Sequence, residues 1–143
     1  MNTHIDKYIL RRPVYGPKCP YCQSLSVLVD SAAIYNGQSY GNAYVCENYP
    51  ECDTYVGCHP DSANPVGTLA NAQLREWRKK AHAIFDQIWM GGGKSRAAAY
   101  TELANRMNMK VSRCHIGMMN AAQCQKVIEI ASDYMVNLQY NKK

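Results

Sequence analysis

The sequence predicts an α+β protein, with a small N-terminal module of short antiparallel strands followed by a bundle of about three α-helices. Between residues 14 and 60, glycines and prolines separate short β-favouring runs, which is typical of strands joined by tight turns. Beyond residue 67, apolar residues recur at helical spacing instead. Because 47% of the 143 residues are hydrophobic, the chain can pack a core in one domain, or in a small module joined to a helical one.

The N-terminal module is assigned to residues 14–60. Its expected strands are the four β-favouring runs at residues 24–29, 31–35, 42–45 and 54–56. These runs carry too little apolar mass to fold alone, so we expect a bound metal ion to supply the missing stability. Residues 59–66 (HPDSANPV) are rich in turn-forming residues and are expected to act as a linker.

The C-terminal module is assigned to residues 67–140, and its first helix to about 68–90. The apolar stripe of that helix consists of Ala70, Leu74, Trp77, Ala81, Ile84, Phe85 and Ile88. The run Gly91-Gly92-Gly93 is expected to end the helix, and Ser95 to cap a second one over about 96–108. Its inward-facing residues are expected to be Tyr100, Leu103, Ala104 and Met107.

A connector over residues 109–119, partly extended, should lead to the third helix. Asn120 and Gln123 have the spacing of a capping box, with Asn in place of Ser or Thr. The apolar stripe of this helix consists of Cys124, Val127, Ile128, Ala131, Met135 and Leu138. The tail, residues 141–143, is expected to fray.

Five of the seven cysteines lie between residues 19 and 58, and their spacing indicates a metal site. CPYC at 19–22 and CENYPEC at 46–52 each bring two thiols to one turn, and 23 residues between them suffice for a hairpin. Four thiolates suit one tetrahedral Zn²⁺, and they leave no open position for a water, so the zinc should be structural. The predicted ligands are Cys19, Cys22, Cys46 and Cys52, and the alternative ligands are Cys58 and His59.

CPYC followed by a hairpin and CENYPEC resembles the C-terminal zinc ribbons of bacterial type I topoisomerases. Their second knuckle has the form CxNYPxC, which Cys46, Asn48, Tyr49, Pro50 and Cys52 match position by position. The resemblance covers about residues 19–56. It implies a ribbon of the kind found on DNA-handling enzymes, and 143 residues leave no room for the cleavage domains of a topoisomerase.

A second resemblance covers more of the chain. The strings YVGCHP at 55–60 and CHIGM at 114–118, with Ala81-His82, Phe85-Asp86 and Trp89 between them, are similar to an uncharacterised family of zinc-finger proteins from phages, plasmids and bacteria. That resemblance implies a reduced, intracellular, zinc-bound protein. The usual second knuckle of the family has two residues between its cysteines, whereas five separate Cys46 from Cys52 here.

The net charge of +5 permits contact with nucleic acid without requiring it. A basic helix face beside a ribbon is suited to phosphates, and exposed tyrosines to unpaired bases. The candidate contact residues are Arg75, Arg78, Lys79, Lys80, Tyr21 and Tyr49. The favoured interpretation is a non-enzymatic, zinc-stabilised binding protein that contacts nucleic acid or a nucleic-acid-processing complex, as an accessory protein of a phage or mobile element.

Two other interpretations remain open. The helical module could dock on a protein partner as an adaptor or inhibitor without nucleic acid. Alternatively, His82 and Asp86, four residues apart on one helix face, could join His59 or His115 in a small metal-assisted hydrolase. The run Gly91-Gly92-Gly93-Lys94-Ser95 is not a phosphate loop, because position 88 is Ile and a helix precedes it.

The chain has no apolar run long enough to cross a membrane, and its first 18 residues are polar and basic rather than signal-like. We therefore expect a cytoplasmic protein, in the host cytoplasm if it is phage-encoded. In that reducing compartment the cysteines should be metal ligands and free thiols. Cys114 and Cys124 are expected to be thiols of the helical core, with Cys114-His115 as a weak metal-binding alternative.

Overall fold

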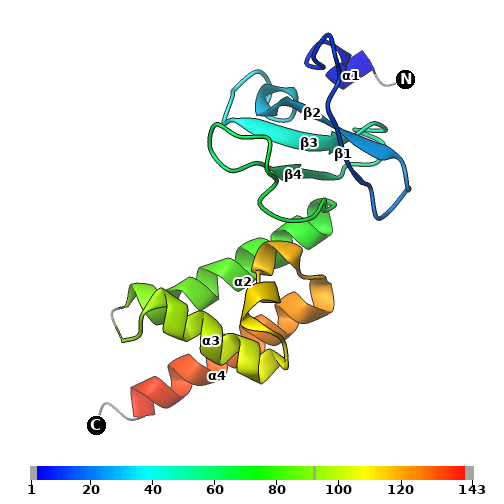
Figure 1. Cartoon of the computed structure of the whole chain (residues 1–143). Coiled ribbons are helices and arrows are strands. Elements are labelled where there is room, and N and C mark those ends of the chain that lie inside the picture. The colour runs from blue at the N-terminus through cyan, green and yellow to red at the C-terminus, as the bar shows by residue number, and fades with distance from the viewer. Residues whose placement is uncertain (1–2, 92, 141–143) are drawn as a thin grey trace. The chain divides into compact units, whose positions relative to one another are not determined.

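The computed structural model describes the backbone of residues 3–91 and 93–140, and the chain divides into two compact units (Figure 1). The first unit runs from Met1 to Gln73 and the second from Leu74 to Lys143. Four antiparallel strands lie in the first unit, and three helices follow. The predicted α+β class, a small ribbon followed by a helical bundle, is confirmed.

The sheet of the first unit has the order β1-β2-β3-β4, with every neighbouring pair antiparallel. The elements of this unit are α1 (Thr3–Asp6), β1 (Tyr15–Lys18), β2 (Leu25–Asp30), the 3-10 turn η1 (Ser31–Ala33), β3 (Asn42–Cys46) and β4 (Tyr55–Gly57). The strands expected at 24–29, 42–45 and 54–56 therefore correspond to β2, β3 and β4.

The strand expected at 31–35 is wrong, because that segment begins with η1. The side chain of Asp30 accepts a hydrogen bond from the backbone N–H of Ala32 at 2.8 Å, and Ser31 Oγ accepts one from Tyr40 N–H at 2.7 Å. Asp and Ser often make such local bonds, which compete with strand pairing. A prediction from the β-propensity of the residues alone does not take these side-chain hydrogen bonds into account.

The sheet separates two small cores, because successive side chains of a strand point to opposite faces. On one face Val27, Val29 and Val45 pack with Ile5 of α1. On the other face lies a cluster that contains Cys19, Leu28, Tyr44, Cys46, Val56 and Leu69. Two predicted zinc ligands are therefore part of the second core.

Residues 59–66 pack against the sheet of the first unit and do not form a free linker. Tyr44 Oη donates a hydrogen bond to the carbonyl of Ala63 at 2.7 Å, and Asn42 Nδ2 donates one to the carbonyl of Ser62 at 3.0 Å. An isolated bridge also joins Cys58 to Pro65. The turn-forming residues were correctly recognised, but the segment returns to the sheet.

The three long helices are α2 (Ala72–Met90), α3 (Arg96–Met107) and α4 (Ala121–Tyr140). The helix α2 begins four residues later than expected, because Ala70 pairs with Tyr55 in a β-bridge instead. Both predicted N-caps are confirmed. Ser95 Oγ accepts from Ala98 N–H at 3.1 Å, and Asn120 and Gln123 exchange reciprocal bonds of 2.9 and 2.8 Å.

The core of the second unit is built mainly from the predicted apolar stripes, without Ala70 and Leu74, and from residues of the connector such as Cys114. Its buried residues include Ala81, Phe85, Ile88, Leu103, Ala104, Cys114, Cys124, Val127 and Ala131. The connector folds into two 3-10 turns, η2 (Val111–Arg113) and η3 (Ile116–Met118), rather than an extended segment. The side chain of Leu138 and the tail at 141–143 lie outside the described residues. Over the part of the chain that the structure describes, none of the helices combines the length and apolar character of a membrane span.

Candidate metal centre

The first pair of cysteines is presented by the turn that follows β1. Cys19 N–H donates to the carbonyl of Ser24 at 2.7 Å, and Gln23 N–H donates to the carbonyl of Cys19 at 2.9 Å. Gln23 adopts a positive φ of 67° inside this turn. The bonds close the CPYC segment tightly, so that Cys19, which is buried, and Cys22, which is exposed, belong to one knuckle.

The second pair lies on the turn that follows β3. Tyr49 N–H donates to the carbonyl of Cys46, and Cys52 N–H donates to the carbonyl of Asn48, both at 3.0 Å. These two bonds reverse the chain within the longer CENYPEC knuckle. Pairing of Ser26 with Cys46 across β2 and β3 fixes the position of this knuckle relative to the first one.

The four sulfur atoms of Cys19, Cys22, Cys46 and Cys52 all lie within 4.8 Å of one another. The Sγ atoms of Cys19 and Cys52 are 3.5 Å apart, and those of Cys22 and Cys46 are 3.4 Å apart. A tetrahedral zinc with bonds of about 2.3 Å requires sulfur–sulfur distances of about 3.8 Å. The cluster therefore has the size and the donor set that zinc requires.

Hydrogen-bond donors surround the sulfur atoms. Thr54 Oγ1, in a side chain that is 1% exposed, lies 3.0 Å from Cys19 Sγ and 3.7 Å from Cys52 Sγ. Asn48 Nδ2 donates to Cys22 Sγ at 3.5 Å, and its backbone N–H donates to Cys46 Sγ at the same distance. When the cysteines are thiolates they only accept, so the Thr54 hydroxyl then donates and stabilises their negative charge.

The protein environment also divides the four thiols by their readiness to ionise. Hydrogen bonds from the backbone and hydroxyl of Ser24 and from Asn48 lower the pKa of Cys22 to about 6. Burial opposes the ionisation of Cys19, but the hydrogen bond with Thr54 and two backbone N–H groups lower its pKa overall. Burial raises the pKa of Cys46 and of Cys52. A cation is therefore needed to hold all four as thiolates.

Thr54 was not identified from the sequence, and Asn48 was noticed only as part of the knuckle motif. The side chain of Asn48 also donates to Ser24 Oγ at 2.8 Å, so it ties the second knuckle to the first. The NYP string at 48–50 was the available signal for Asn48. Thr54 gave no comparable signal, since a threonine beside a short strand is ordinary.

The structure places the alternative ligands apart from the cluster of four. Cys58 follows β4 and packs, partly buried, against the core that contains Leu28 and Tyr44. His59 is exposed and makes turn hydrogen bonds through its backbone. Burial raises the pKa of the Cys58 thiol, as expected for a packing residue.

The residues of the hydrolase interpretation do not assemble a second metal cluster among the described side chains. His82 is half-buried on α2, and Asp86 accepts a hydrogen bond from Trp89 Nε1 at 3.1 Å. His115 Nε2 lies 3.0 Å from the carbonyl of Ser112. Each of these contacts is local to its own helix or turn.

The candidate nucleic-acid residues are distributed over both units. On α2, Arg78 Nε donates to the carbonyl of Met119 at 3.0 Å, so this guanidinium ties α2 to the connector that precedes α4. Lys79 and Lys80 are exposed, with Lys79 3.6 Å from Glu76 and Lys80 beside the Trp77 ring. Arg75 is half-buried.

The two candidate tyrosines belong to the first unit. Tyr21 is 46% exposed, and its hydroxyl accepts from Asn71 N–H at 3.4 Å. Tyr49 is half-buried and lies edge-to-face with Tyr55, with ring centroids 6.3 Å apart. The structure therefore gives Tyr49 a packing contact in addition to any role in binding.

A four-stranded antiparallel sheet with two cysteine knuckles on adjacent turns defines a zinc-ribbon finger. The sequence profile of the zinc-finger-containing domain family matches residues 16–134, so the chain belongs to that family. Neither a curated protein nor a solved structure matches the chain significantly. The family and the cluster of four cysteines together support one structural Zn²⁺ in the finger.

Proposed function

We propose that this is a non-enzymatic binding protein whose zinc-stabilised finger contacts single-stranded nucleic acid, alone or within a nucleic-acid-processing complex of a phage or mobile element. The observation that carries the proposal is a connected row of tyrosine rings on the finger. The two resemblances described for the sequence, to ribbons of DNA-handling enzymes and to zinc-finger proteins of phages and plasmids, support the same interpretation.

The tyrosine row consists of Tyr40, Tyr35, Tyr55 and Tyr49, in edge-to-face contact. Ring centroids are 5.2 Å apart for Tyr40 and Tyr35, 6.4 Å for Tyr35 and Tyr55, and 6.3 Å for Tyr55 and Tyr49. Tyr40 is 74% exposed and Tyr35 is 43% exposed, whereas the other two rings are half-buried. The row therefore has one anchored end and one accessible end.

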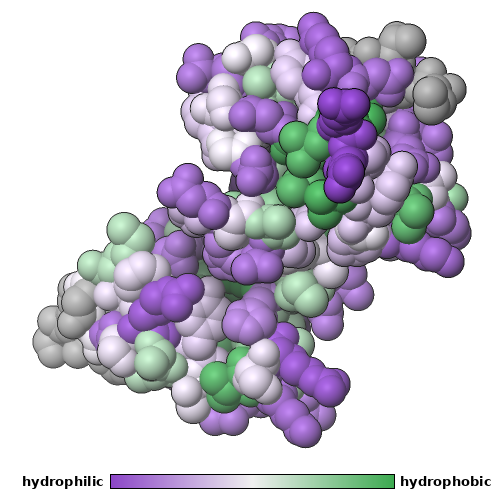
Figure 2. Space-filling view, turned by 45° about the horizontal axis from the view of Figure 1, so that its top comes forward, coloured by the Kyte–Doolittle hydropathy of each residue, from purple (hydrophilic) through white to green (hydrophobic). Residues whose placement is uncertain are grey.

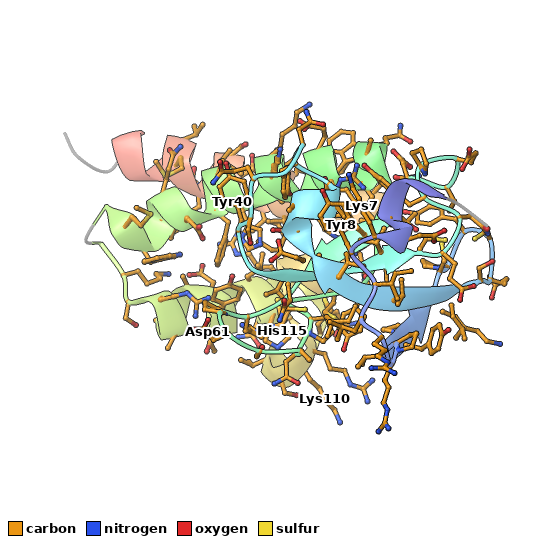
Figure 3. All side chains as sticks on the ribbon, turned by 90° about the horizontal axis from the view of Figure 1, so that it is seen from above. Lys7, Tyr8, Tyr40, Asp61, Lys110 and His115 are labelled. Carbon is orange, nitrogen blue, oxygen red and sulfur yellow. The ribbon has the colours of Figure 1, made fainter. Side chains whose placement is uncertain are left out.

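The zinc knuckle holds the anchored end of the row, because Tyr49 is part of CENYPEC. The accessible end lies in the loop between β2 and β3, where Figure 3 labels Tyr40. Aromatic rings on such a platform stack with unpaired bases of any sequence. Since duplex bases are already stacked, the row favours single strands over duplexes.

Exposed lysines supply the second element of the proposal, attraction to phosphates. Lys79 and Lys80 extend from α2, and the chain as a whole carries a charge of +5. Binding that relies on such charges weakens at high salt, because releasing condensed counterions from the strand then gains less entropy. The proposal therefore requires an affinity that falls steeply with ionic strength.

The test uses zinc-loaded full-length protein and a fluorescently labelled 20-nucleotide strand, alone and as a duplex, at several salt concentrations. We expect preferential binding of the single strand. Since base stacking is worth about 1–3 kcal/mol per base, Tyr40→Ala should lower the affinity for the single strand by about 5- to 150-fold. Tyr15→Ala, which removes another exposed tyrosine outside the row, is the matched control.

Two outcomes would contradict the proposal. One is the absence of binding to either form at low ionic strength, which would favour the protein-binding adaptor. The other is equal weakening by Tyr40→Ala and Tyr15→Ala, which would show that the tyrosine row is not the contact surface.

A further inference from the structure

A groove of about 550 Å³ lies on the finger, between its N-terminal segment and the sheet. Its floor is formed by Ile5 and Val27, each only 1% exposed. Its walls include Leu10 and Tyr15, each 54% exposed. Pockets that hold small ligands occupy about 300–1,000 Å³, so a groove of this size has room for a few side chains of a partner.

The sequence accounts for this groove through the path of residues 5–15. The helix α1 packs Ile5 onto the sheet, and Ile9 forms an isolated bridge with Val29, so the segment is fastened at two points. Beyond them the chain continues to β1 through exposed apolar residues, which include Leu10 and Val14. Figure 2 shows hydrophobic side chains grouped on the surface of the finger beside strongly hydrophilic ones.

Two carboxylates line the groove together with the apolar residues. They belong to Asp6, at the end of α1, and to Glu47, in the second zinc knuckle. Both side chains are exposed, and neither forms an ion pair with another described residue. Arg11 and Arg12 belong to the same segment but do not line the groove.

We propose that this groove binds a segment of a partner protein in which a large apolar side chain stands next to lysine or arginine. The apolar floor would accept the large side chain, and the carboxylates of Asp6 and Glu47 would attract the adjacent cation. The same carboxylates repel phosphate, so this surface is unsuited to nucleic acid. It shares no residue with the tyrosine row, which leaves the finger able to bind both ligands.

The proposal is tested with zinc-loaded full-length protein and a displayed library of random twelve-residue peptides. We expect the enriched peptides to share a large apolar residue beside a basic one. A synthetic peptide with that consensus should bind in solution and shift the amide resonances of Leu10, Tyr15 and Glu47 in nuclear magnetic resonance spectra.

Two variants separate the apolar and the charged contributions. Leu10→Asp should lower the affinity for the peptide by more than about tenfold, because it places a charge in the apolar wall. The double substitution Asp6→Asn and Glu47→Gln should lower the affinity for a basic peptide by up to about fivefold per carboxylate. It should leave the affinity for a peptide with neutral flanks unchanged. Val136→Asp, at an apolar position of α4 that is 50% exposed, is the matched control and should change nothing.

Enrichment of acidic peptides, or of none, would overturn the proposal, as would a consensus peptide whose affinity survives Leu10→Asp. Shifts confined to α2 and α4 would assign the peptide to the helical unit and would equally overturn it. If Tyr40→Ala loses binding to the single-stranded nucleic acid and keeps its affinity for the peptide, the two sites on the finger are separate.

Discussion

Replacing Thr54 by valine should weaken zinc binding without changing the shape of the finger core. Valine has nearly the same outline as threonine, and the side chain at this position is 1% exposed. The substitution replaces the hydroxyl by a methyl group and so removes one donor, whose Oγ1 atom lies 3.0 Å from Cys19 Sγ and 3.7 Å from Cys52 Sγ. The shorter distance makes Cys19 its principal acceptor.

The expected magnitude follows from two independent ranges. A hydrogen bond to a charged group is worth about 1.5–3 kcal/mol. Removing the hydrogen-bond partner of a metal ligand lowers metal affinity by about 10- to 100-fold, which is about 1.4–2.7 kcal/mol. The two ranges agree, so Thr54→Val should raise the dissociation constant for zinc by about 10- to 100-fold.

Competition with a chromophoric chelator measures that dissociation constant. Replacing zinc by cobalt then distinguishes the loss of a hydrogen bond to the thiolate from a general destabilisation of the finger. Loss of a donor to a thiolate raises the energy of its sulfur electrons, so the sulfur-to-cobalt charge-transfer band of Thr54→Val should move to longer wavelength. Ser31→Ala is the control, since it removes another buried hydroxyl hydrogen bond far from the sulfur atoms. An unchanged band and a zinc affinity within twofold of wild type would refute the role of Thr54.

Three further predictions concern the helical unit and are measured on the full chain by urea unfolding followed through helical circular dichroism. Phe85→Ala should cost about 3–5 kcal/mol, because this ring is 1% exposed at the centre of the core; a loss below 1 kcal/mol would contradict that placement. Ser95→Ala should cost about 1 kcal/mol by removing the N-cap bond of α3, whereas the exposed neighbour Ala97→Ser should be nearly neutral. Burial lowers the pKa of His82 in spite of the opposing charge of Asp86, so stability should be full above the ordinary histidine pKa of about 6.5 and fall as pH decreases through the lower folded value. His82→Gln should flatten this acid limb, and an unchanged limb would exclude His82 as its source.

The predicted fold and cysteine cluster depended on features with strong local signals. Each cysteine knuckle, CPYC or CENYPEC, can be recognised within a segment of seven residues or fewer. The apolar stripes of α2, α3 and α4 have a clear helical period. Ser95 and the pair Asn120 and Gln123 also act within one helical turn, so their caps were visible in the sequence.

The errors arose where tertiary contacts or side-chain hydrogen bonds decide the outcome. β1 was not foreseen because two of its four residues are Gly16 and Pro17, which usually interrupt strands. The fold requires glycine at position 16, because a Cβ atom there would lie only 2.3 Å from the ring of Tyr44. The bond of Arg78 to the distant carbonyl of Met119, which ties α2 to the connector before α4, was likewise not foreseen, whereas the role of Arg78 in nucleic-acid contact stays a prediction.

The site residues show the same division. The sulfur atoms could be grouped by spacing, whereas the donors that stabilise them could not. Thr54 reaches Cys19 across 35 positions of sequence, and this proximity exists only after β3 and β4 have paired. The tyrosine row likewise joins residues from a loop, a strand and a knuckle, so the sequence shows its members without their order.

The most direct test of the central claim is the zinc content of purified cysteine variants, measured by elemental analysis. We expect one zinc per chain in the wild type, in Cys58→Ser and in Cys124→Ser, and loss of that zinc in Cys19→Ser and Cys52→Ser. Retention of zinc by Cys52→Ser together with its loss from Cys58→Ser would contradict this ligand set, because it would move the site from the cluster of four to the end of β4.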